Sequence, residues 1–208
     1  MKIIPAILAN DINRFKKYLQ ICVDLGVDEI QIDIADGKFV NNTTVSISEI
    51  MQELKNFKFK LQFHLMVKDV TQHLEELKQI NFEIIYIHFE ALDKNYDFSN
   101  KKIGLAINPE TQIEKIEKYL KYINSVLIMT VEPGFYGGKF LTENLEKIKD
   151  LKKLNFNGTI GIDGGINNET FKKAIKYQPD FVCSGSYLLN DENPKEIFDE
   201  YRKIISKS

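Results

Sequence analysis

Two aspartates stand in short apolar runs that are far apart in the chain. Asp33 lies in "EIQIDIADG", and Asp163 ends the run in "TIGIDGG". Side chains alternate along a strand, so Gln31 and Asp33 share one face, and a polar pair facing an apolar interior is costly unless it is used or paired. Two carboxylates on opposite sides of one carbon suit an inversion, in which one removes a proton and the other returns it to the far face. The sequence therefore predicts Asp33 and Asp163 as a paired acid and base.

The same residues have the chemistry of metal ligands. A proton beside a carbonyl or hydroxyl group is not acidic enough for a plain carboxylate, and a divalent metal ion bridging the oxygens of the enediolate would supply the missing electrophile. Asp33, Asp163 and His64 in "FKLQFHLMV" suit Zn²⁺, Fe²⁺, Mn²⁺ or Co²⁺. A lone histidine is also often an ordinary core residue, and His88 and Glu90 in "IIYIHFE" can equally be loop residues.

Glycine turns follow three consecutive apolar runs and predict a site for phosphate. Glycine lets the backbone approach a ligand closely, and the helix after Asp163, opening near Asn167 or Asn168, would present free N–H groups to an anion. One such turn is weak support, but three after consecutive strands favour a phosphate cradle. The residues expected in it are Gly134, Gly137, Gly138, Gly164, Gly165, Gly185 and Ser186.

The elements that must position these residues alternate along the whole chain. The apolar runs predict buried parallel strands at 3–8, 29–34, 60–66, 84–88, 102–107, 125–130, 159–162 and 180–183. Amphipathic stripes predict helices at 11–25, 113–122, 141–153, 168–177 and 194–206, while the connection 89–101 is polar and its helix is expected to be short or absent. This alternation predicts an α/β fold, a (β/α)8 TIM barrel, with a doubly wound open sheet as the alternative.

Composition excludes several classes of protein. The chain has 208 residues, 43% of them hydrophobic and 28% charged, which fits one domain over residues 1–208. A net charge of -2 does not indicate binding to nucleic acid or to a membrane surface. The start "MKIIPAILAND" is too short an apolar run for a signal peptide, and no run is long enough for a membrane helix, so a cytosolic protein is expected. Cys22 and Cys183 are expected to be reduced core residues.

Motifs along the whole chain resemble those of the ribulose-phosphate 3-epimerase family, which includes allulose-6-phosphate 3-epimerases. In order they are "PAILAND", "IDIADGKFV", "FHLMV", "IHFE", "GLAINPET", "MTVEPGF", "IDGGIN" and "SGS". The resemblance implies a (β/α)8 barrel and a divalent metal ion. It also implies that Asp33 and Asp163 are acid/base residues that bind the metal, with His64 as a further ligand.

The resemblance also implies where the substrate binds. Its phosphate would sit on Gly137, Gly165, Gly185 and Ser186, and Met66 would pack beside the metal. The substrate would be a phosphorylated ketose, and a homo-oligomer is expected.

Five positions depart from the family's usual pattern. Ala6 stands where the family has a serine that contacts substrate, Ala35 replaces a methionine near the metal, Asn41 replaces a proline, and Tyr136 replaces a small residue after the sixth strand. Gln31 stands where the family has a histidine ligand. A glutamine carbonyl can bind a metal, but more weakly than imidazole, so we expect weaker binding and a preference for Mn²⁺ or Mg²⁺.

Three functions follow from this reading. The first is a ketose-phosphate 3-epimerase that interconverts D-ribulose 5-phosphate and D-xylulose 5-phosphate, or acts on a six-carbon ketose 6-phosphate. The second, suggested by Gln31 and Ala6, is a catalytically impaired phosphosugar-binding homologue. The third is a decarboxylase of a sugar acid phosphate, which needs a lysine near the scissile carboxylate; Lys38 lies just beyond "IQIDIAD".

Overall fold

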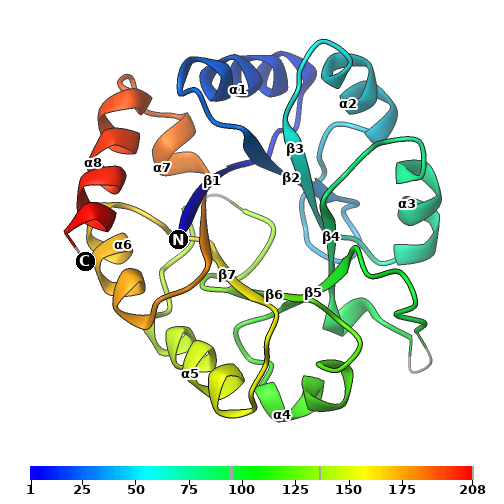
Figure 1. Ribbon diagram of the computed structural model, residues 1–208. Coiled ribbons are helices and arrows are strands. Elements are labelled where there is room, and N and C mark those ends of the chain that lie inside the picture. The colour runs from blue at the N-terminus through cyan, green and yellow to red at the C-terminus, as the bar shows by residue number, and fades with distance from the viewer. Residues whose placement is uncertain (94–95, 136, 208) are drawn as a thin grey trace.

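The computed structural model is a closed barrel of parallel strands surrounded by helices (Figure 1). It describes residues 1–93, 96–135 and 137–207. Eight strands follow one another around the barrel in chain order, and β1 pairs with β8 to close it. The strands are β1 (Lys2–Ile7), β2 (Glu29–Ala35), β3 (Lys60–Met66), β4 (Ile84–His88), β5 (Ile103–Ile107), β6 (Ser125–Met129), β7 (Thr159–Asp163) and β8 (Phe181–Ser184). The predicted TIM barrel is confirmed, and the open sheet is wrong.

The strands lie within one residue of their predicted bounds. Their nearly continuous apolar sequences are what a strand covered on both faces requires, and all seven residues of β2 are buried. One face of each strand packs on the helices, as Ile30, Ile32 and Phe63 do, and the other faces the barrel axis.

The helices differ more from their predicted bounds. They are α1 (Ile12–Asp24), α2 (Ile47–Leu54), α3 (Val70–Leu77), α4 (Ile113–Ile116), α5 (Glu146–Lys153), α6 (Asn168–Ala174), α7 (Ser186–Leu189) and α8 (Pro194–Ser206). The helix at 194–206 is confirmed. Those at 113–122 and 168–177 end in 3-10 turns, Glu117–Tyr119 and Ile175–Tyr177, and that at 141–153 begins with one, Thr142–Leu145. Within the described parts of 89–101 there is a 3-10 turn, Phe89–Ala91, and no α-helix.

Aromatic rings fill the half of the barrel at the amino ends of the strands. Tyr86 and Phe181 point to the axis, and the ring of each lies against a glycine on the neighbouring strand. A Cβ atom on Gly161 would lie 2.0 Å from the ring of Phe181, and one on Gly104 would lie 2.8 Å from the ring of Tyr86. The amino half of the barrel axis is therefore filled by side chains, and the space along the axis lies toward the carboxyl ends of the strands.

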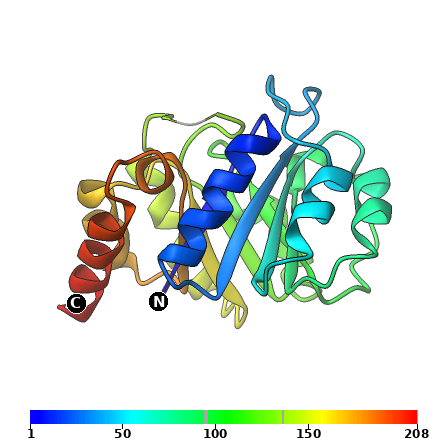
Figure 2. The same cartoon turned by 90° about the horizontal axis from the view of Figure 1, so that it is seen from above.

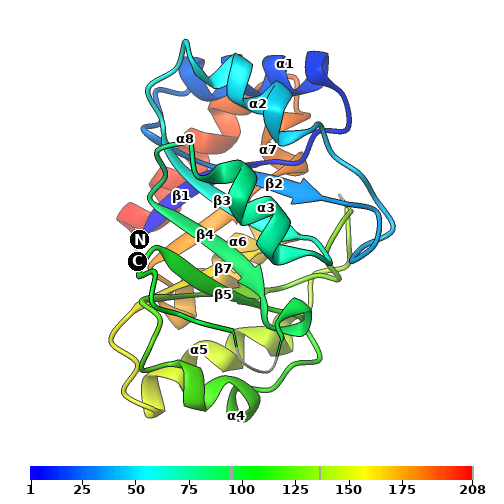
Figure 3. The same ribbon diagram turned by 90° about the vertical axis from the view of Figure 1, so that its right-hand side faces the viewer.

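The loops that follow the strands gather at one end of the molecule. Figure 3 shows both chain termini at the end opposite to the arrowhead of β2. Figure 2 shows α1 lying along the outside of the barrel, where its buried residues Phe15, Leu19 and Cys22 pack on the strands. None of the helices in the described residues has the length and apolar character needed to cross a membrane.

Candidate active site

A cavity of about 320 Å³ opens at the carboxyl ends of the strands. It brings together every predicted site residue except Gln31, although these residues come from most of the length of the chain. Those that line it are Asp33, His64, Met66, Gly134, Gly137, Gly138, Asp163, Gly164, Gly165, Gly185 and Ser186.

The two aspartates face each other from β2 and β7, and Gln31 bridges them. The amide nitrogen of Gln31 donates one hydrogen bond of 2.8 Å to Oδ1 of Asp33 and another of 2.6 Å to Oδ2 of Asp163. Gln31 is fully buried one layer below the cavity, and each aspartate is only 7% exposed. The alternation of β2, read from the sequence, is what places the amide beneath the carboxylates.

Burial and mutual repulsion make this a pair that holds a proton. Burial first, and then the negative charge of Asp33, raise the pKa of Asp163 to about 7, while His64 and the Gln31 hydrogen bond oppose the rise. Two coupled carboxylates in one buried site do not both ionise readily, so one is the base while the other keeps its proton.

The ring of His64 completes a group of three potential metal ligands. Its Nδ1 lies 3.3 Å from Oδ1 of Asp33 and 3.5 Å from Oδ2 of Asp163, and the ligand atoms of all three residues are within 4.8 Å of one another. Burial opposes a charge on this ring, but the closeness of Asp33 and then of Asp163 raises the pKa of His64. Nδ1 is buried and makes no hydrogen bond to any residue that the structure describes. A buried nitrogen that makes no hydrogen bond to a described residue and faces two carboxylate oxygens fits a site for a divalent cation.

Gln31 does not present its oxygen to this group. Its Oε1 accepts a hydrogen bond of 3.1 Å from the thiol of Cys183, and its nitrogen faces the carboxylates. Ligation by Gln31 would require the amide to turn over and to give up these bonds. The expected role of Gln31 as a ligand stays a prediction.

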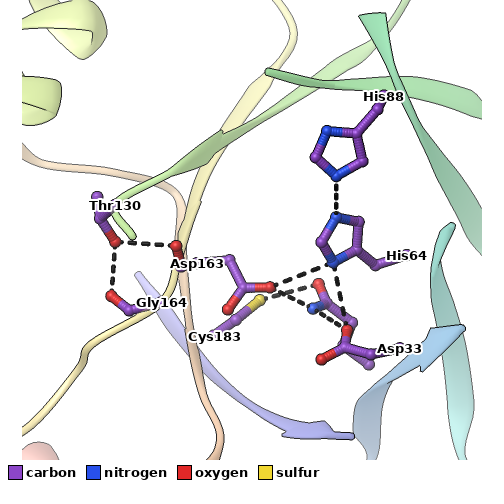
Figure 4. Close-up of polar contacts among 8 residues, drawn as sticks. Asp33, His64, His88, Thr130, Asp163, Gly164 and Cys183 are labelled. Carbon is purple, nitrogen blue, oxygen red and sulfur yellow. Dashed lines mark hydrogen bonds and ion pairs between the residues drawn. The ribbon is translucent and has the colours of Figure 1, made fainter. Parts of the chain in front are cut away.

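Thr130, directly after β6, holds the turn that carries Asp163. Its hydroxyl donates to the carbonyl of Asp163 at 2.9 Å and to that of Gly164 at 2.6 Å (Figure 4). Gly164 has φ +109°, and a Cβ atom there would lie 2.3 Å from Val131, so no other residue fits. Sequence reasoning missed Thr130, although it lies in the telling motif "MTVEPGF".

His88 and Glu90 lie behind His64, where the sequence left open whether they were loop residues. Nε2 of His88 lies 2.8 Å from Nε2 of His64, and Nδ1 of His88 lies 3.3 Å from Oε2 of Glu90. Burial lowers the pKa of His88 to about 4. Burial alone would raise the pKa of Glu90, but hydrogen bonds from His88, Thr111 and the backbone of Asn108 lower it below its ordinary value. The sequence did contain a signal for this pairing: His88 and Glu90 are two positions apart at the end of a strand, so their side chains would point to the same side.

The glycine loops form the opposite wall of the cavity. Gly137, Gly165, Gly185 and Ser186 all line it, as a phosphate cradle requires. The predicted free N–H groups at the start of α6 are partly wrong. Asn167, rather than Asn168, is the N-cap, and its side chain accepts hydrogen bonds from the first turn of the helix.

Two of the departures from the family's pattern, Ala6 and Ala35, lie at the cavity or directly beneath it. Ala6 lines it, and Ala35 packs in a small buried cluster with Leu8 and Met66 beneath it. Asn41 lies in the loop after β2, where its neighbour Asn42 donates a hydrogen bond of 2.7 Å to the carbonyl of Gly134. The expectation for Tyr136 lies outside the described residues. Lys38 is exposed and is not among the described residues that line the cavity, which removes the feature that a decarboxylase would need.

Known proteins are similar to this chain over nearly its whole length. A profile of the ribulose-phosphate 3 epimerase family matches residues 2–189. A ribulose-phosphate 3-epimerase of Methanocaldococcus jannaschii is 32% identical over 98% of this chain and 90% of its own. The cytoplasmic isoform of ribulose-phosphate 3-epimerase from Oryza sativa subsp. japonica is 30% identical over 100% of this chain and 95% of its own.

The fold is also shared with more distant enzymes. The structure of 3-hexulose-6-phosphate synthase from Salmonella typhimurium superposes with a TM-score of 0.71 at 12% identity, covering 100% of this chain and 99% of that one. This likeness shows the barrel alone.

The chain belongs to the ribulose-phosphate 3-epimerase family. The predicted membership is confirmed, and with it the expectation of an isomerase that acts on carbohydrate phosphates.

Proposed function

We propose that the protein interconverts D-ribulose 5-phosphate and D-xylulose 5-phosphate by proton transfer between C3 and two aspartates. The observation that carries the proposal is the meeting of Asp33 and Asp163, from β2 and β7, around one hydrogen-bond donor inside a single cavity. The family membership supplies the reaction type, and the geometry supplies a base and an acid for it.

One carboxyl group of the pair acts as the base and the other as the acid. The ionised member takes the proton from C3 on its own side of the sugar, and the protonated member delivers its proton to C3 from the other side. In the reverse direction the two residues exchange roles. In the metal-free protein, the raised pKa of Asp163 allows its carboxyl group to keep a proton near neutral pH.

A divalent cation fits Asp33, His64 and Asp163 as ligands. When bound, it supplies electrophilic stabilisation for negative charge on the substrate oxygens beside C3. Zn²⁺, Fe²⁺, Mn²⁺ and Co²⁺ all suit this donor set, and Mg²⁺ suits its two carboxylates. Gln31 becomes a fourth ligand only if its amide turns over.

The phosphate of the substrate is held on the side of the cavity formed by Gly137, Gly165, Gly185 and Ser186. Binding there fixes the distance from the phosphate to the aspartates, so that one carbon of the sugar lies between them. A site of this kind selects a phosphorylated ketose as the ligand. We also expect the protein to form a homo-oligomer in the cytosol.

A six-carbon ketose 6-phosphate is the second candidate substrate. Ala6 lines the cavity where the family has a serine, which removes a hydroxyl group and leaves more room. A phosphosugar-binding homologue without turnover is the remaining alternative, and it has no use for a buried pair of aspartates.

The experiment is a comparison of substrates on one preparation. We expect kcat/KM for D-ribulose 5-phosphate to exceed that for D-allulose 6-phosphate in protein loaded in turn with each of the five ions. A higher value for the six-carbon sugar would reassign the substrate. Binding of both sugars without turnover under every ion would establish the binding-only role.

A further inference from the structure

Two buried histidines meet behind the cavity through the same atom of each ring. Nε2 of His64 lies 2.8 Å from Nε2 of His88, and the ring centroids are 4.9 Å apart (Figure 4). Only one proton fits between two nitrogens at this distance, so one ring donates and the other accepts. Which of them donates decides where the remaining proton of His64 can lie.

Glu90, on the far side of His88, determines which nitrogen of His88 carries the proton. Its Oε1 accepts hydrogen bonds from the backbone N–H of Asn108 at 3.0 Å and from the hydroxyl of Thr111. Its Oε2 faces Nδ1 of His88 at 3.3 Å. An ionised carboxylate can only accept, so the proton of His88 lies on Nδ1.

The direction of the next hydrogen bond follows. His88 is fully buried and has one proton in its neutral form, so its Nε2 carries a lone pair. His64 must then donate from its own Nε2. The other nitrogen of His64, Nδ1, is left as the one that faces Asp33 and Asp163, where it makes no hydrogen bond to a described residue.

We propose that Glu90 and His88 are positioning residues that fix the tautomer of His64, so that its Nδ1 lone pair is available to a divalent cation. The inference rests on the metal site of the proposed function. It gives a role to the residues of "IHFE", a motif that belongs neither to the acid/base pair nor to the phosphate cradle. In metal sites, a partner behind the ligand commonly orients a histidine in this way.

The relay is held rigidly from outside. The loop after β5, which supplies Asn108, is tied down by Lys147, whose ammonium group donates to the carbonyls of Asn108 at 3.0 Å and of Pro109 at 2.7 Å. Phe39 packs on the ring of His88 with centroids 4.7 Å apart. The orientation of Glu90 is therefore set by residues that do not line the cavity.

Glu90→Gln tests the direction of the relay. Asn108 and Thr111 still need an acceptor, so the new amide oxygen takes their hydrogen bonds and the NH2 group faces Nδ1 of His88. That reverses both protons and places one on Nδ1 of His64, where it blocks the ligand atom. We expect Co²⁺, titrated into metal-stripped protein and followed by its visible absorption, to bind about 10–100-fold more weakly than to wild type.

Thr111→Val is the matched control. It removes one donor to Glu90 and keeps the carboxylate, so the relay keeps its direction and Co²⁺ affinity should stay close to that of wild type. Equal Co²⁺ affinity in wild type and Glu90→Gln would overturn the proposal, as would equal losses in Glu90→Gln and Thr111→Val.

A measurement on the wild-type protein needs no variant in the relay. The chain has 3 histidines, and His73→Asn, at a half-buried position on α3, identifies one of the three ring signals. We expect ¹⁵N NMR to show the proton of His88 on Nδ1, and a proton on Nε2 alone would overturn the relay. The outcomes separate from those of the proposed function: protein without epimerase activity that shows this tautomer and the Glu90→Gln loss overturns the function and supports the relay. Active protein without them does the reverse.

Discussion

Gln31 on β2 donates a hydrogen bond of 2.6 Å to the carboxylate of Asp163 on β7, across the barrel. The two residues are 132 positions apart in the chain. The same amide nitrogen also binds Asp33, so one neutral side chain ties together two groups that would otherwise repel each other. At the position where the family usually has a histidine, this protein has a donor that the carboxylates share.

Replacing Gln31 with leucine should therefore destabilise the metal-free protein. Gln31→Leu keeps the volume nearly constant and removes the shared donor, and a hydrogen bond to a charged group is worth about 1.5–3 kcal/mol. We expect urea denaturation to show a fall in the free energy of unfolding of this size. Gln20→Leu, at an exposed position on α1, is the control and should change it by less than about 0.5 kcal/mol. Equal stability of Gln31→Leu and wild type would show that the bridge contributes nothing.

Removing either carboxylate should stop epimerisation. Asp33→Asn and Asp163→Asn keep the shape of the side chain and remove the proton carrier, and general acid/base catalysis contributes about 10²–10⁴-fold. We expect kcat to fall by at least this factor in each variant, and to stay unchanged in Asp150→Asn, a half-buried position on α5 that does not line the cavity. A variant that keeps most of its activity would remove that aspartate from the mechanism.

The stability of the metal-free protein should depend on pH through Asp163. Its pKa is raised in the folded state to about 7, above the ordinary value of 3.8, so the folded protein binds the proton more tightly. The stability gained in this way is present at low pH and is lost as pH rises from about 4 through 7. His88, whose pKa burial lowers to about 4, acts in the opposite direction between pH 4 and 6.5.

The measurement that isolates Asp163 is thus a difference between two proteins. Thermal unfolding of metal-stripped wild type and Asp163→Asn is recorded from pH 4 to 8. We expect the variant to gain stability relative to wild type as pH rises through 7. Parallel curves would mean that Asp163 titrates alike in the folded and unfolded chains.

The phosphate cradle can be tested with one added charge. Ser186→Asp places a carboxylate beside Gly185 in the wall of the cavity, where it repels a phosphate and removes a hydroxyl donor. We expect KM and the inhibition constant of inorganic phosphate to rise at least about tenfold, because 1.4 kcal/mol corresponds to that factor. Ser99→Asp, which adds the same charge at an exposed position, should change neither value. Unchanged inhibition by phosphate in Ser186→Asp would move the cradle elsewhere.

The strands and the members of the cavity wall were readable from the sequence because their cause is local. A strand such as β2 must be apolar on both faces, so Gln31 and Asp33 stand out as exceptions that the fold has to use. The glycines after β6, β7 and β8 are visible because each loop turns there. Helix ends were less predictable, since whether residues 117–119 continue α4 or tighten into a 3-10 turn depends on tertiary packing.

The contacts inside the site could not be read in the same way. The rotation of the Gln31 amide depends on Asp163, 132 residues away, and on Cys183, 152 residues away, and the pairing of His64 with His88 depends on the register of β3 and β4. Thr130 was missed because a threonine at the end of a strand is common, and only the structure shows which carbonyls it binds.

In the proposed reaction, two aspartates move the C3 proton of D-ribulose 5-phosphate. The most direct test of this transfer is NMR of that sugar in D2O with wild-type protein whose metal content has been measured. We expect a near-stoichiometric divalent ion, formation of D-xylulose 5-phosphate and incorporation of deuterium at C3, with no xylulose 5-phosphate formed by Asp33→Asn or Asp163→Asn. Protein that holds its ion, binds the sugar and leaves the C3 proton in place under all five metals would contradict it.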